Sequence, residues 1–140
     1  MEMGVQVFWQ VDNLFEYLIQ QDRTLKGLRD RLLHRSSSVT RQEQIEFGGR
    51  LRDKLQDARE RVSQRTMAHL REVAVEAKVD EPIEEKMAMN GLFLVWKEQQ
   101  QRFTEQVEKG AGLMGEEFAL KVDGPWVPFN FIEHIEFSPQ

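Results

Sequence analysis

The most informative run in this sequence is MAMNGLFLVW, residues 87–96. It is nearly all apolar, and charged residues flank it on both sides. A short apolar run of this kind is typical of a strand that is covered on both faces. The run therefore predicts a central strand over residues 87–96, and the other elements are placed around it.

A second segment, GVQVFWQ at residues 4–10, has the period of two that is typical of strands. Val5, Val7 and Trp9 lie on one side, and Phe8 lies on the other. Because both sides carry apolar residues, this strand is also expected away from the edge of the sheet.

Two further strands are expected over residues 72–80 and 117–123, where apolar residues alternate with polar ones. Such alternation predicts strands with one buried face. Pro82 follows the first strand and Gly124–Pro125 follows the second. Proline cannot donate a hydrogen bond to a neighbouring strand, so both strands are expected to end there.

Helices are expected over residues 12–34, 40–71 and 98–112, where leucine and other apolar residues follow helical spacing. Asp12 or Asn13 can cap the first helix, and Thr40 with Glu43 forms a capping box for the second. A serine turn joins these two helices, which predicts an antiparallel helical hairpin. A cluster of glycines is expected to end the third helix; these are Gly110, Gly112 and Gly115.

The order of the elements is strand, helix pair, strand, strand, helix, strand. It predicts an α+β fold with the βαββαβ plan of a ferredoxin-like four-stranded antiparallel sheet, and an enlarged helical hairpin in the first crossover. In that plan the first and third strands are central, and these are the two strands that are apolar on both faces. We expect a single domain over residues 1–140.

Composition excludes several classes of protein. The 140 residues contain no cysteine, which excludes a disulfide scaffold, a thiolate nucleophile and a cysteine-ligated metal site. The N-terminal sequence lacks the basic and apolar regions of a signal peptide, and no apolar run approaches the length of a membrane span. We therefore expect a cytoplasmic protein that does not contact a membrane.

Charge is unevenly distributed along the chain. Residues 1–72 hold 13 Lys/Arg and 11 Asp/Glu, a balance of +2, and residues 73–140 hold 6 and 13, a balance of −7, which together give the net charge of −5. The arginines of the second helix alternate with acidic residues and spread around it, which indicates a solvated face. No nucleic-acid partner is expected.

A segment rich in proline and aromatic residues follows the last strand and opens with GPWVPFNFI, residues 124–132. Such a segment cannot continue a helix or occupy a central strand. The tail, residues 124–140, either covers the sheet edge or the base of the hairpin, or exposes an anchor for another protein. Aromatic residues dominate protein-binding hot spots, and the residues expected to bind a partner are Trp126, Val127, Phe129 and Phe131.

Two motifs in the C-terminal half resemble the gas vesicle protein GvpL/GvpF family. That family typically shows an N-x-x-F-L-V strand, and later a strand ending in GPWPPY followed by Ser or Asn, Phe and Val. MGVQVF, residues 3–8, is similar to the strand that opens the family's C-terminal domain, so the resemblance covers about residues 3–137. Val127 replaces the usual proline and Phe129 the usual tyrosine. The matching residues of the two motifs are Asn90, Phe93, Leu94 and Val95, and Gly124, Pro125, Trp126, Pro128, Phe129, Asn130 and Phe131.

The resemblance implies a non-catalytic accessory protein of gas vesicle assembly, located in the cytoplasm and at the vesicle. It implies binding to the hydrophobic shell protein GvpA and to other vesicle accessory proteins. It also implies structural roles for Asn90, Phe93, Gly124, Pro125 and Pro128. Full-length members have an additional N-terminal domain, so self-association or binding of another protein through a bare surface is expected.

The residues themselves give little support to catalysis. His34, His69 and His134 lack the spacing of a metal site, so neither a metal nor a cofactor is expected. Ser36–Ser38 have no visible general base. The alternative that remains open is a small-ligand-binding or enzymatic domain on the same fold, which would need a pocket with convergent polar groups.

Overall fold

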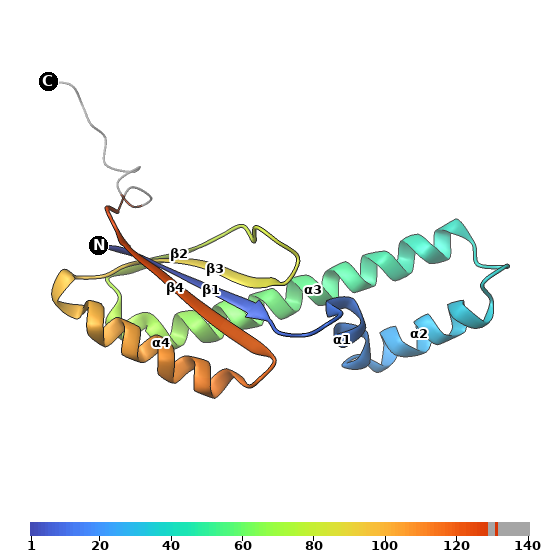
Figure 1. The fold of residues 1–140 in the computed structure, drawn as a ribbon. Helices are drawn as coiled ribbons and strands as arrows, with labels where there is room; N and C mark the ends of the chain where they lie inside the picture. Colours follow the sequence, from blue (N-terminus) through green and yellow to red (C-terminus); the bar gives the residue numbers. More distant parts are fainter. Residues whose placement is uncertain (129–130, 132–140) are drawn as a thin grey trace, which may run out of the picture. The chain divides into compact units, whose positions relative to one another are not determined.

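A computed structural model describes residues 1–128 and residue 131 of the chain. Figure 1 shows its elements. The chain forms two compact units, one made of residues 1–10 with residues 61 onward and the other of residues 11–60. The expectation of a single domain stays a prediction, and the two units are described in turn.

The first unit contains a four-stranded antiparallel sheet in the order β2-β3-β1-β4. The order confirms the predicted α+β ferredoxin-like fold, with the first and third strands at the centre. Both central strands are long and largely buried, as expected for strands with neighbours on each side. The bounds are β1 (Glu2–Trp9), β2 (Glu76–Asp80), β3 (Met87–Leu94) and β4 (Phe118–Trp126).

One face of this sheet is covered by α4 (Gln100–Met114) and by residues 61–70 of α3 (Arg41–Leu70). Val5 and Val7 of β1 are completely buried on this face. The rings of Phe93 on β3 and Phe103 on α4 lie 5.4 Å apart, and both are buried. The hydrophobic core of the first unit therefore lies between the sheet and these two helices.

The other face of the sheet has no helix packed on it among the described residues of the first unit, and is called the open face here (Figure 1). Its side chains are those that alternate with the buried ones along each strand. They are mixed in character: Gln6 and Leu92 lie in the centre together with the buried Glu2 and Asn90, and further charged residues lie on the two edge strands. The charged residues are Glu76, Lys78 and Asp80 on β2, and Lys121 and Asp123 on β4.

The second unit is helical and contains α1 (Leu14–Gln20), α2 (Arg23–His34) and the first 20 residues of α3. The prediction of one helix over residues 12–34 was wrong, because Asp22 is extended and caps a new helix by accepting the N–H of Leu25 at 3.1 Å. Leu18 and Leu25 are seven residues apart, a spacing that the helical pattern preserves across the break. Asn13, rather than Asp12, caps α1.

Other predicted bounds shift for local reasons. The strand expected over residues 72–80 begins only at Glu76, because Arg71–Val73 form a 3-10 turn after α3. A second such turn, Lys97–Gln99, precedes α4, so the helix expected over residues 98–112 begins at Gln100. That helix ends at Met114, before Gly115 with its φ of +98°. The strands expected over residues 4–10, 87–96 and 117–123 correspond to β1, β3 and β4, and the helix expected over residues 40–71 corresponds to α3.

Candidate functional site

The end of the edge strand β4 exposes two apolar side chains. Trp126 is 53% exposed and Val127 is 55% exposed. The indole N–H of Trp126 donates to the Asp123 carboxylate at 3.1 Å, which fixes the ring on the open face of the sheet. These two neighbouring apolar side chains are therefore a candidate surface for binding another protein.

Gly124 and Pro125 lie inside β4, although the prediction ended the strand before them. The pairing of β4 with β1 shifts between Glu2 and Gly4, so β4 carries one extra residue there. β4 lies at the edge of the sheet and pairs with β1 alone. The missing N–H of Pro125 therefore removes no hydrogen bond to a strand on the outer side of β4. The bulge therefore lets β4 continue to Trp126 and aims the indole at the open face.

Two of the motif residues, Asn90 and Phe93, belong to the body of the fold. The Asn90 amide N–H donates to the carbonyl of Glu81 at 3.0 Å and so holds the loop between β2 and β3 against β3. Phe93 is 1% exposed and packs on Phe103. These contacts give both residues a part in holding the fold together.

The rest of the predicted binding segment is only partly described. Pro128 is half-buried, and its carbonyl accepts the N–H of Phe131 at 3.1 Å. Phe129 and most of the tail lie outside the described residues. Among the predicted binding residues that the structure describes, Trp126 and Val127 are therefore exposed, and Phe131 is half-buried.

An apolar groove of about 300 Å³ lies between the C-terminal ends of α3 and α4, above β4. Leu113 at its rim is 72% exposed, whereas Met114 is buried. The amino-acid sequence does not reveal this groove, because the groove depends on how far apart the two helix ends lie. The residues that line it include Ala68, Leu70, Val107, Leu113, Met114 and Leu120.

Polar groups in this groove bind mainly to the protein itself. Since a carbonyl can only accept, the His69 ring donates its Nε2–H to the carbonyl of Gln106 at 2.8 Å. The Gln106 amide donates back to the His69 carbonyl at 3.3 Å. A Cβ at Gly110 would meet the His69 ring at 2.8 Å, so glycine allows the ring to pack there. The Thr66 hydroxyl is buried without a hydrogen-bond partner among the described residues.

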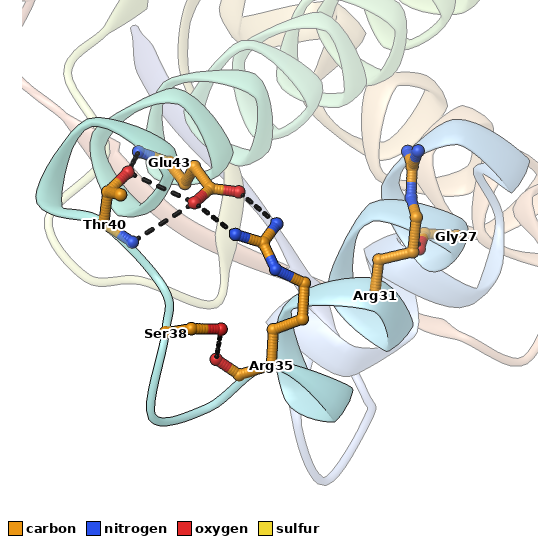
Figure 2. Close-up of polar contacts among 6 residues, drawn as sticks. All are labelled: Gly27, Arg31, Arg35, Ser38, Thr40 and Glu43. Carbon is orange, nitrogen blue, oxygen red and sulfur yellow. Dashed lines mark hydrogen bonds and ion pairs between the residues drawn. The ribbon is translucent and has the colours of Figure 1, made fainter.

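The tip of the helical hairpin in the second unit is held by charged groups (Figure 2). Arg35, after α2, forms a two-pronged contact with the Glu43 carboxylate, at 2.7 and 3.0 Å. Glu43 also accepts from Thr40, whose hydroxyl in turn accepts the Glu43 N–H at 3.1 Å. The predicted capping box is therefore present and is fastened to α2 by Arg35.

We expect this tip to loosen in acid. The hydrogen bond from Arg35, followed by those from Thr40, lowers the pKa of Glu43 below its ordinary value of 4.5. A lowered pKa in the folded state means that the contact stabilises fully above pH 4.5 and is lost as the pH falls through the lower, folded value. The difference in melting temperature between the wild type and Glu43→Gln should therefore shrink as the pH falls from 6 towards 3, about where carboxylates protonate.

The matched control for this titration is Glu46→Gln. Glu46 lies one turn further along α3 in a long contact with Arg50 at 3.5 Å, and both side chains are more than half exposed. Its effect on the melting temperature should be small at every pH. A Glu43→Gln effect that is constant between pH 6 and pH 3 would contradict the proposed contact.

The described residues contain no group of three or more histidine, aspartate or glutamate side chains that could hold a metal ion. His34 lies in the second unit and His69 in the first, while His134 lies outside the described residues. Within the part of the chain that the structure describes, no helix is both long and apolar enough to cross a membrane.

Comparison with known proteins gives consistent matches. Residues 1–133 match the family described as "Gas vesicle synthesis protein GvpL/GvpF". The chain is 24% identical over 132 residues to "Gas vesicle protein F" of Dolichospermum flosaquae, and equally so to the protein of that name from a Nostoc species. Each alignment covers 94% of this chain and 53% of the relative, so the chain spans about half the length of these relatives.

Two crystal structures share the fold. The gas vesicle protein GvpF from an Anabaena species superposes with a TM-score of 0.80 at 24% identity, over 93% of this chain and 52% of that protein. GvpF from Microcystis aeruginosa superposes with a TM-score of 0.75 at 20% identity, over 93% of this chain and 53% of that protein.

Proposed function

Because the chain belongs to the gas vesicle synthesis protein GvpL/GvpF family, we propose that it is a non-catalytic accessory protein of gas vesicle assembly. In this proposal it acts in the cytoplasm and at the growing vesicle. It binds the hydrophobic shell protein GvpA, and it contacts other vesicle proteins.

The observation that carries this proposal is the exposed pair Trp126 and Val127 at the end of β4. A shell subunit that polymerises has apolar surface that must stay covered until it is incorporated. Trp126 offers a large rigid apolar ring, and its hydrogen bond to Asp123 limits the entropy that binding would cost. The segment therefore suits an apolar partner surface.

The groove between α3 and α4 supports the same role. It is lined mainly by apolar side chains, and Leu113 at its rim is exposed. A catalytic or small-ligand site needs several polar groups that converge on one point. The polar side chains that line this groove are Arg65, Thr66 and His69, of which His69 is bound to the carbonyl of Gln106. This composition favours binding of an apolar surface over chemistry.

Co-expression with a gas vesicle shell protein tests the proposal. The wild-type chain should increase the soluble fraction of GvpA, and the double variant Trp126→Ser with Val127→Ser should lose most of that increase. A hot spot of this kind is worth about 2 kcal/mol or more, which is at least about thirtyfold in affinity.

The matched control is Ile83→Ser. Ile83 is 80% exposed in the loop between β2 and β3, so it is also an exposed apolar side chain, at a different place. It should leave the soluble fraction of GvpA unchanged. The proposal would be abandoned if the wild-type chain left GvpA insoluble, or if Ile83→Ser reduced its solubility as strongly as the double variant.

A further inference from the structure

Four charged residues on the open face of the sheet lie in two rows that run across all four strands; a third row, Glu76, Leu94, Glu2 and Trp126, carries two acidic residues. The first row is Lys78 on β2, Leu92 on β3, Gly4 on β1 and Asp123 on β4. It has a positive charge at one edge and a negative charge at the other.

The second row is Asp80, Asn90, Gln6 and Lys121 in the same strand order. Its charges have the reverse order, with the negative charge on β2 and the positive charge on β4. The two rows are neighbours on the same face, because their members are two residues apart on every strand.

Neither Lys78 nor Lys121 has an ion-pair partner among the described residues. Each lysine has an acidic residue two positions along its own strand, Asp80 for Lys78 and Asp123 for Lys121, but neither pair forms an ion pair in the part of the chain that the structure describes. The acidic residue of its own row lies on the opposite edge of the four-stranded sheet, about 14 Å away at the usual strand spacing. Both lysines therefore offer a charge to a group outside this chain.

We propose that the open face binds a second copy of this chain and forms a two-fold symmetric dimer. A half-turn about an axis parallel to the strands places β4 of the second copy over β2, and its β1 over β3. Lys78 then faces Asp123 of the second copy, and Asp80 faces its Lys121. Each of these contacts occurs twice in the dimer.

At the centre of the face, Gln6 and Leu92 are the half-exposed side chains, whereas Asn90 is 8% exposed and its amide already donates to the carbonyl of Glu81. The space above Gly4 is filled by the side chains of Asp123 and Gln6, so Leu92 meets these side chains of the second copy. A half-turn about an axis perpendicular to the strands also pairs the charges, and a charge-swapped double variant distinguishes the two axes. Two sheets that pack face to face usually keep their strands nearly aligned.

Sedimentation equilibrium of the full chain, without any shell protein, tests this inference at concentrations up to about 100 µM. The wild type should show a reversible dimer. Lys121→Glu and Asp80→Lys should each raise the dimer dissociation constant about tenfold or more, because each places like charges opposite one another. The double variant should return to within about threefold of the wild type, because the swapped charges attract again.

The control is Lys109→Glu on α4, an exposed lysine on the other side of the sheet, which should leave the dissociation constant unchanged. A wild type that stays monomeric over the whole range would overturn the inference, as would a dimer that neither single variant weakens. A double variant weaker than both single variants would reject the parallel axis, because a perpendicular axis places like charges together in that variant. The test leaves Trp126 and Val127 intact, so its failure is separate from a failure of shell-protein binding.

Discussion

Replacing Phe93 with alanine is expected to lower the free energy of unfolding of the first unit by about 3–5 kcal/mol. Phe93 is 1% exposed, and its ring lies 5.4 Å from that of Phe103. The variant therefore loses buried apolar surface, an aromatic pair and packing between β3 and α4. Trp9, Trp96 and Trp126 all belong to the first unit, so urea unfolding followed by tryptophan fluorescence measures this change.

Ile83→Ala is the matched control for this variant. Ile83 is 80% exposed, so removing its side chain should change the free energy of unfolding by no more than about 0.5 kcal/mol. A Phe93→Ala variant as stable as the control would mean that β3 and α4 do not share the core described above.

Replacing Gly124 with alanine should destabilise the first unit by about 2–3 kcal/mol. Gly124 has a φ of +99°, which side-chain-bearing residues rarely adopt. A Cβ at this position would lie 2.8 Å from the backbone carbonyl oxygen of Glu2, and a backbone atom cannot move aside easily. Chemical denaturation is again the measurement, and loss of the bulge would also free the Trp126 indole from its place next to β1.

Gly112→Ala provides the comparison for this variant. Gly112 lies in α4 with open space where a Cβ would be, and its φ is not in the left-handed region. Alanine there should stabilise the helix by about 0.5–1 kcal/mol. If both glycine variants shifted stability in the same direction, the strain assigned to Gly124 would be wrong.

Several elements were predictable because their cause is local. The apolar run of residues 87–96 indicated a central strand, and β3 is central. The Thr40–Glu43 capping box could be recognised from the sequence because both partners lie within one helical turn. The break at Asp22 was missed for a local reason as well, since the leucines on either side keep the helical spacing.

The ends of β4 and α4 could not be predicted from nearby residues. Pro125 normally ends a strand, yet β4 continues because it is an edge strand whose bulge lies opposite Glu2 and Gly4. Gly110 normally weakens a helix, yet α4 continues through it because the His69 ring packs there. In both cases the deciding partner is far away in the sequence.

The amino-acid sequence alone determined the order of strands and helices, the two central strands and the family, because periodicity, caps and short motifs act over a few neighbouring residues. Only the tertiary structure decided which side chains share a face. The apolar groove depends on the separation of two helix ends, and the reversed charge rows of the open face depend on strand register. Strand register places Lys78 and Asp123 in one row, with two strands between them. These residues are 45 positions apart in the sequence, so no local pattern contains this relation.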